Sequence, residues 1–198
     1  MNRPDDLPLL GAAMPSDALP VWRDWLAEGP RDIELQDFFR AELLDGDWRR
    51  VARAARAELQ GHRGRLGIHG PFMGFDIDTQ DPAVRAIVQK RLDQGLDVCE
   101  ELGATQMVLH SPFKTWTYHN LDNQAGAREK LHERVHAALD KAVARAERIG
   151  VTLVIENIED KDPHARAQLA RSFGSDRVRV SLDTGHAYYA HVSTGAPP

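Results

Sequence analysis

Two residues that commonly bind metal ions, Asp183 and His186, stand three positions apart directly after a short apolar run at residues 178–182. A carboxylate and an imidazole on either side of a Thr-Gly turn would place two potential metal ligands at one rim of a sheet. Three earlier apolar runs also end in residues of this kind, and these are His69, His110 and Glu156. We therefore interpret the ends of these runs as parts of one site.

The elements that must position these residues alternate regularly along the chain. Apolar stretches that predict strands occupy residues 7–13, 32–35, 65–69, 106–110, 151–156 and 178–182. Helical patterns separate them, and four have clear bounds, at residues 16–28, 47–59, 81–103 and 124–149; a shorter helix begins at Asp162-Pro163. Strands that alternate with amphipathic helices predict parallel βα units, in which ligands gather at the carboxyl ends of the strands.

The predicted fold class is therefore α/β, a TIM (β/α)8-type barrel of which about six βα units are present. A closed barrel of this kind has eight units and typically about 250 residues, whereas this sequence has 198. We expect residues 1–198 to form a single barrel domain that lacks the last two βα units, as the retained part of a longer protein.

Composition restricts the class of partner. Hydrophobic residues make up 42% of the chain and charged residues 28%, with 25 basic and 30 acidic side chains and a net charge of −5. This acidic balance argues against a protein that grips a nucleic-acid backbone. The single Cys99 excludes an internal disulfide and a cysteine-built zinc site. No apolar run approaches the length of a membrane span, and we expect a cytoplasmic protein.

Four short segments resemble the xylose-isomerase-like barrel superfamily, which includes sugar-phosphate isomerases and epimerases and the endonuclease IV group. They are IHGPF at residues 68–72, LGATQMVLH at 102–110, VIEN at 154–157 and LDTGH at 182–186. The resemblance implies a TIM barrel with one to three divalent ions at the strand ends, and Glu156 and Asp183 as metal ligands. His186, His69 and His110 would bind substrate or further metal. Additional ligands, a His and a Glu, would come from strands seven and eight.

We therefore predict a metal-dependent isomerase or epimerase of a small sugar, sugar phosphate or related hydroxy-ketone. Proton transfer would pass through an enediolate, with Glu156 and His186 as catalytic residues. The divalent ion would be Mn, Mg, Co or Zn, because mixed oxygen and nitrogen ligands suit all four. Glu34, Lys114 and Trp116 are further candidates for substrate contact, with Lys114 suited to a phosphate. A homo-oligomer remains open.

Two other functions stay open at this stage. One is a zinc-dependent abasic-site DNA repair enzyme of the endonuclease IV type, and the other is a barrel relative without catalytic activity. A separate motif, His132-Glu-Arg-Val-His136, fits the H-E-x-x-H pattern of zinc proteases. Its helix should pack outside the sheet, away from the strand ends, so we interpret it as structural.

Overall fold

A six-stranded parallel sheet in the order β1-β2-β3-β4-β5-β6 forms the centre of the described part of the chain. The protein is represented by a computed structural model that describes residues 8–194. The strands are β1 (Gly11–Met14), β2 (Asp32–Leu35), β3 (Leu66–His69), β4 (Gln106–His110), β5 (Thr152–Glu156) and β6 (Val178–Ser181). Leu7, at the start of the first predicted strand, lies outside the described residues. The predicted α/β class with about six βα units is confirmed.

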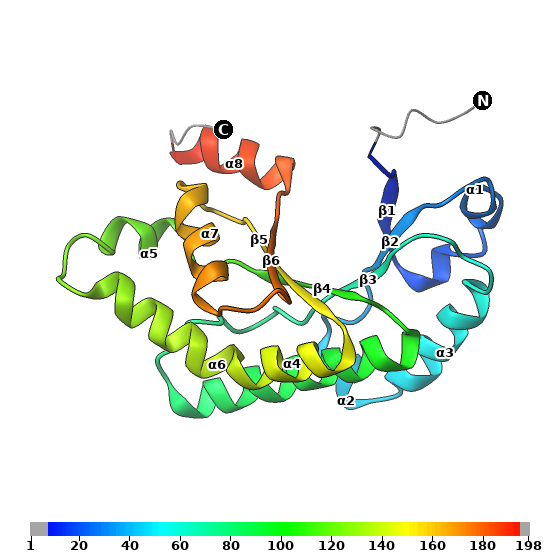
Figure 1. Ribbon diagram of the computed structural model, residues 1–198, viewed down its shortest axis with the longest axis horizontal. Helices are drawn as coiled ribbons and strands as arrows, with labels where there is room; N and C mark the ends of the chain where they lie inside the picture. Colours follow the sequence, from blue (N-terminus) through cyan, green and yellow to red (C-terminus); the bar gives the residue numbers. More distant parts are fainter. Residues whose placement is uncertain (1–7, 195–198) are drawn as a thin grey trace.

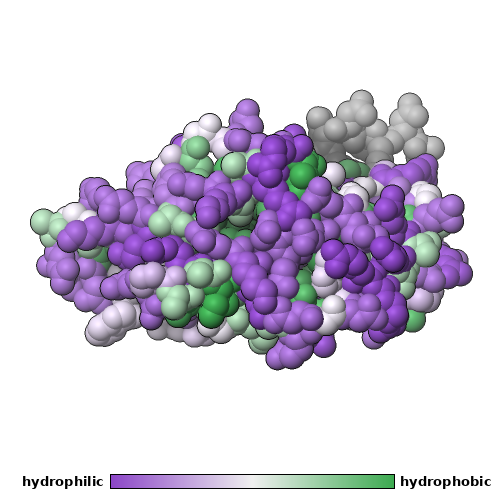
Figure 2. All heavy atoms as spheres, turned by 90° about the horizontal axis from the view of Figure 1, so that it is seen from below, coloured by the Kyte–Doolittle hydropathy of each residue, from purple (hydrophilic) through white to green (hydrophobic). Residues whose placement is uncertain are grey.

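Helices connect the strands and cover one face of the sheet. They are α1 (Arg23–Ala27), α2 (Ala41–Asp45), α3 (Trp48–Glu58), α4 (Pro82–Leu102), α5 (Thr115–Asn120), α6 (Ala127–Ile149), α7 (Pro163–Ser172) and α8 (Thr184–Thr194), with a short 3₁₀ helix at Ser16–Ala18. Figure 1 shows the long helices α4 and α6 side by side beneath the curved sheet. The outer surface of this helical layer is mostly hydrophilic (Figure 2), as expected for amphipathic helices.

Successive side chains along β3, β4 and β5 point alternately toward the helices and away from them. The residues that face them are at most 1% exposed and belong to the main hydrophobic core; they are Ile68, Met107, Leu109, Leu153 and Ile155. Because successive strand residues point to opposite faces, the intervening residues lie on the other side of the sheet. The final residue of each of these three strands falls on that opposite face.

A glycine allows helix α4 to approach the sheet closely. A Cβ atom at Gly95 would lie 2.7 Å from the Met107 Sδ of β4 and 3.1 Å from the Pro71 Cδ. Gly95 is buried in the middle of a 21-residue helix, where glycine normally costs stability. The close packing against Met107 explains why a side chain is not accommodated there.

Local sequence signals set the ends of α4. The Asp81 carboxylate accepts hydrogen bonds from the backbone N–H groups of Ala83, at 2.7 Å, and Val84, at 3.4 Å. Pro82 follows in the first turn, and Gly103 ends the helix with a φ of 72°. Asp162 caps α7 in the same way through the His164 N–H, at 2.8 Å. The helix starts predicted at both Asp-Pro pairs are therefore confirmed.

The predicted helix at residues 16–28 is wrong as a continuous element. Pro20 has no N–H and disfavours a helix interior, and the segment divides into the 3₁₀ turn and α1. The Ser16 N–H is bound instead by the Asp37 carboxylate, at 2.7 Å.

Three shorter helical pieces also differ from the sequence-based expectation. Helix α2 was not predicted. The expected loop at residues 113–118 is helical from Thr115, where α5 begins, and the expected Thr184-Gly185 turn is the first turn of α8. These segments are short or lack a clear apolar periodicity, so pattern alone does not identify them.

The two outer strands of the described sheet each have a single strand neighbour. Near the β6 side, large apolar residues are exposed, with Leu182 at 69%, Tyr188 at 68% and Val192 at 64%. The expectation that the chain lacks two βα units stays a prediction. Among the described helices, none combines the length and the apolar character that a membrane crossing would require.

Replacing the α4 cap should weaken the fold measurably. We expect Asp81→Ala to lower the free energy of unfolding by about 1 kcal/mol, because two backbone N–H groups lose their acceptor. Urea unfolding followed by circular dichroism measures this change. Asp81→Asn, which preserves a capping oxygen, is the matched control and should stay close to the unsubstituted protein. Equal stability of the Ala and Asn variants would contradict this role of Asp81.

Candidate metal centre

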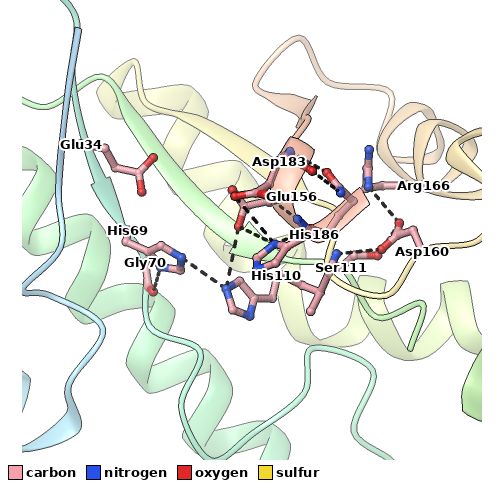
Figure 3. Close-up of polar contacts among 12 residues, drawn as sticks. Glu34, His69, Gly70, His110, Ser111, Glu156, Asp160, Arg166, Asp183 and His186 are labelled. Carbon is pink, nitrogen blue, oxygen red and sulfur yellow. Dashed lines mark hydrogen bonds and ion pairs between the residues drawn. The ribbon is translucent and has the colours of Figure 1, made fainter. Parts of the chain in front are cut away.

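His69, His110 and Glu156 meet at the carboxyl ends of β3, β4 and β5 (Figure 3). One potential ligand atom from each lies within 4.8 Å of the other two. The register of the sheet brings these three residues together. His110 of β4 pairs directly with Glu156 of β5. On the other side of β4, Ile68, which precedes His69, pairs with Met107. In the described part of the chain, this trio is the cluster of three His, Cys, Asp or Glu residues that could hold a metal ion.

The spacing of the trio fits a shared ion. The Nε2 atoms of His69 and His110 are 3.2 Å apart, and His110 Nε2 is 4.0 Å from the Glu156 Oε2. Two atoms that bind one tetrahedral zinc at about 2.0–2.1 Å lie about 3.3 Å from each other. The two imidazoles already have this separation, and the Glu156 carboxylate, which lies within 4.8 Å of both, would have to approach them by on the order of 1 Å.

Hydrogen bonds to backbone carbonyls fix the tautomers of His69 and His186, and the Nε2 of His69 in turn lies within hydrogen-bond distance of the His110 Nε2, at 3.2 Å. The Nδ1–H of His69 donates to the Gly70 carbonyl at 3.0 Å, and the Nδ1–H of His186 donates to the Asn157 carbonyl at 2.9 Å. A carbonyl can only accept, so these contacts assign the proton to Nδ1 and leave the lone pair on Nε2. Metal-binding histidines commonly have this arrangement, with the second nitrogen fixed by a backbone carbonyl.

Two features hold His69 and His110 in place: the close approach of the backbone at Gly70 to strand β4, and the packing of an aromatic ring against both imidazoles. Gly70 follows His69, and a Cβ atom there would lie 2.5 Å from the Val108 carbonyl oxygen of β4. The Phe72 ring stacks on His110 with centroids 4.0 Å apart and lies 4.8 Å from the His69 ring. Phe72, which lies in the loop that follows β3, therefore restricts the movement of both imidazoles.

A second pair of potential ligands, Asp183 and His186, lies beside Glu156. The Nδ1 of His186 is 4.0 Å from the Glu156 Oε2 and 3.9 Å from the Asp183 Oδ2. The other Asp183 oxygen, Oδ1, accepts a 2.7 Å hydrogen bond from the His186 backbone N–H in the first turn of α8. Both carboxylates therefore lie at the same rim of the sheet, as Figure 3 shows.

Asn157 continues the hydrogen bonding between the β5 and β6 segments beyond the ends of the two strands. Its side-chain Nδ2 donates to the Asp183 carbonyl and its Oδ1 accepts from the Asp183 N–H, both at 2.8 Å. The residue is buried, and its own carbonyl holds His186. One side chain thus fixes the backbone of the Asp183–His186 pair. The sequence places Asn157 next to Glu156, but adjacency alone did not indicate this role.

Burial strongly affects the ionisable groups of the site. Desolvation raises the pKa of Glu156, the His69 imidazole opposes the rise, and the Glu34 carboxylate adds to it. Desolvation also lowers the pKa of His110 to about 4, and the neighbouring His69 lowers it further. His110 is therefore uncharged at neutral pH, and an uncharged imidazole can bind a metal ion.

Glu34 faces this group across the sheet. Burial raises the pKa of its carboxyl, the hydrogen bond that its Oε1 accepts from the Gln36 amide at 2.6 Å lowers it, and the Asp183 charge raises it again. Strands β2 and β6 are not neighbours in the sheet, so this mutual influence reflects the curvature that brings their ends toward each other. Figure 3 shows the Glu34 carboxylate on the same side as Glu156.

The remaining predicted residues lie outside the trio. The Lys114 ammonium pairs with the Asp76 carboxylate at 2.5 Å, and Trp116 on α5 is 81% exposed. The H-E-x-x-H motif lies on α6, where His136 hydrogen-bonds Asp140 at 3.0 Å and Ser172 at 2.8 Å. These partners agree with a structural role for the motif.

A buried ion pair supports the loops beside the trio, and the sequence analysis did not find it. The Arg166 guanidinium lies 3.0 Å from the Asp160 Oδ1, with side chains 5% and 3% exposed. The same Asp160 oxygen accepts from the Ser111 Oγ at 2.9 Å, and the Ser111 N–H donates to the Glu156 carbonyl at 2.9 Å. This network joins the loops that follow β4 and β5, directly after His110 and Glu156.

The curved parallel sheet with candidate ligand side chains at its carboxyl ends defines the class as a TIM-barrel-type α/β protein. A family model described as the xylose isomerase-like TIM barrel matches residues 27–194. The chain belongs to this family. The resemblance expected from the four short segments is thereby confirmed.

Solved structures agree with this assignment. A protein from Thermus thermophilus, soaked with ZnCl2, is 27% identical with a TM-score of 0.63; the match covers 90% of this chain and 67% of that chain. A D-tagatose 3-epimerase-like protein is 15% identical, with a TM-score of 0.69 and coverage of 92% and 67%. An AP endonuclease of family 2 from Brucella melitensis is 15% identical, with a TM-score of 0.62 and coverage of 95% and 72%.

The chain spans about two thirds of the length of the Thermus thermophilus protein and of the D-tagatose 3-epimerase-like protein. No curated protein matches its sequence.

Loss of the Asn157 side chain should destabilise the protein. We expect Asn157→Ala to lower the free energy of unfolding by about 1–3 kcal/mol, because the backbone N–H and carbonyl of the partly buried Asp183 lose their partners. Urea unfolding measures this loss. The exposed Asn123, which hydrogen-bonds the Asn120 side chain at 3.0 Å, provides the matched control, and Asn123→Ala should change stability by less than about 0.5 kcal/mol. Similar losses in both variants would argue against the special role of Asn157.

Proposed function

We propose that this chain carries the metal centre of an isomerase or epimerase that acts on a small sugar or a related hydroxy-ketone. The observation that supports this most directly is the convergence of His69, His110 and Glu156 within 4.8 Å at the strand ends. Membership of the xylose isomerase-like family and the epimerase-like structural relatives support the same class. The reaction of the whole protein, its substrate and its metal dependence are parts of this proposal.

The donor set suits a divalent ion. Two imidazole nitrogens and one carboxylate oxygen are ligands for zinc, cobalt or manganese, and in the proposal Asp183 is a further ligand beside Glu156. A bound ion would supply positive charge next to the carbonyl and hydroxyl oxygens of the substrate while a proton leaves carbon. Zinc is the first metal to test, because two imidazoles belong to the trio and the 27% identical structure was soaked with ZnCl2.

The residues of the chain would move and position the proton. Glu156 is proposed to remove the proton and return it, because its carboxylate lies at the carboxyl end of β5 beside the two imidazoles that would hold the ion. His186, with Nδ1 fixed on the Asn157 carbonyl, would accept a hydrogen bond from a substrate hydroxyl through Nε2. Glu34 faces Glu156 and is proposed as a further substrate contact.

A second candidate is a zinc-dependent enzyme that cleaves DNA at abasic sites. The observation that favours it is the pair of imidazoles 3.2 Å apart, with Asp183 and His186 adjacent to the same carboxylate. This arrangement could distribute more than one zinc ion around Glu156. The net charge of −5 argues against tight duplex binding. Cleavage of an abasic-site duplex that Asp183→Asn abolishes would favour this candidate over the sugar enzyme.

Substitution of the proposed base should remove turnover. In the metal-loaded protein, Glu156→Gln should reduce the exchange of carbon-bound hydrogen with solvent deuterium by a factor of about 10² or more, because the amide cannot accept the proton. Nuclear magnetic resonance of ketohexoses in D2O measures the exchange directly.

The control for this experiment is Glu133→Gln on the exposed face of α6. It changes charge and shape identically but lies on the outer helix layer. The proposal predicts exchange in Glu133→Gln at the rate of the unsubstituted protein. It would be contradicted by undiminished exchange in Glu156→Gln, or by the absence of metal-dependent exchange in the unsubstituted protein across ketohexoses and their phosphates.

A further inference from the structure

A pocket of about 550 Å³ adjoins the metal centre and shares His110 with it. The end of β4 and the loops that follow β3, β4 and β5 form the pocket, so it lies at the carboxyl ends of the same strands. Its volume falls in the range that holds small molecules. A substrate whose reacting carbons lie beside His110 could therefore extend into this pocket.

The pocket offers flat and apolar surfaces. Phe72, which stacks on His110, and Phe75 both line it, together with Met73 and Ile77. Met73 is 59% exposed, and Phe75 is only partly buried against the core. Aromatic and aliphatic surfaces of this kind pack against the C–H face of a sugar ring, and the few polar groups then fix its orientation.

The charges of the pocket do not favour a phosphate. Lys114 is the cationic side chain among the lining residues, and its ammonium lies 2.5 Å from the Asp76 carboxylate. A second lining carboxylate, Glu159, is held by the Thr115 N–H at 2.8 Å. A phosphate placed here would have to displace Asp76 from Lys114 and would remain close to both carboxylates.

The metal centre adds to this negative charge. Glu34, Glu156 and Asp183 lie at the same strand ends and influence one another electrostatically. The two positive charges of one divalent ion would not neutralise these three carboxylates together with Asp76 and Glu159. A dianionic group therefore meets repulsion in the pocket, whereas hydroxyl groups can hydrogen-bond to the same carboxylates.

We propose that the substrate is an unphosphorylated sugar whose uncharged, non-reacting end sits in this pocket, against Phe72 and Phe75, while its reacting carbons lie at the metal centre. This inference rests on the proposed isomerase or epimerase function and specifies its substrate class. The Lys114–Asp76 pair makes the pocket select against phosphorylated sugars, because the one cationic side chain that lines the pocket is already paired with a carboxylate.

Binding measurements test the inference independently of turnover. Isothermal titration calorimetry of the zinc-loaded protein with D-fructose and D-fructose 6-phosphate should show at least about ten-fold tighter binding of the neutral sugar. Asp76→Asn should narrow or reverse this ratio, because Lys114 is then free to pair with the phosphate. Adding Lys114→Gln to Asp76→Asn should restore the preference for the neutral sugar. Phe75→Ala should weaken binding of the neutral sugar.

Tighter binding of the 6-phosphate by the unsubstituted protein, or an unchanged ratio in Asp76→Asn, would overturn the inference. Failure of D-fructose to bind would also contradict it. Metal-dependent hydrogen exchange with the phosphate as the better substrate would overturn this inference alone and leave the proposed function standing. Preferential binding of the neutral sugar without any metal-dependent exchange would support the inference on substrate class and contradict the isomerase function.

Discussion

Burial of one face of the sheet against the helical layer fixes the position of the whole site. Ile68, Leu109 and Ile155 are at most 1% exposed, and burying each contributes about 1.5–3 kcal/mol. Their immediate successors in the sequence, His69, His110 and Glu156, must therefore point to the opposite face. The position of the candidate metal ligands is thus a consequence of the largest favourable term in the folding of the chain.

The same arrangement creates an electrostatic cost at the strand ends. Glu34 and Glu156 are partly buried and lie close to Asp183, and burial together with the neighbouring carboxylates raises the pKa of both. Carboxylates placed together in partly desolvated surroundings destabilise one another unless positive charge is nearby. His110 does not supply that charge, because burial lowers its pKa to about 4. A divalent ion would compensate the group, and such perturbed clusters are typical of functional sites.

Outside the trio, hydrogen bonds hold the surrounding backbone. Asn157 fixes the backbone of Asp183, and the Arg166–Asp160 pair ties Ser111 to the loops around Glu156. These contacts position the backbone next to the candidate ligands without themselves contributing candidate ligands. Such supporting contacts limit the reorganisation that metal binding requires.

Much of this fold could be predicted from the sequence, because its signals are local. The Asp81-Pro82 and Asp162-Pro163 pairs mark helix starts, and the apolar runs at β4 and β5 mark buried strands. The shared location of the strand-end residues follows from the parallel topology.

Contacts between distant parts of the chain could not be predicted in this way. No local pattern indicates that Lys114 pairs with Asp76, that Phe72 stacks on His110, or that Asn157 binds the Asp183 backbone. The apolar periodicity of the sequence also does not indicate helix α5 or the break near Pro20. The roles of the individual site residues therefore stay predictions.

The central claim is that His69, His110 and Glu156 share one metal ion. Anomalous diffraction at the zinc absorption edge, on crystals of the zinc-loaded protein, tests it most directly. The account predicts a peak within about 2.0–2.2 Å of His69 Nε2, His110 Nε2 and a Glu156 oxygen. Zinc located elsewhere, with these three side chains still hydrogen-bonded to each other or to water, would contradict it.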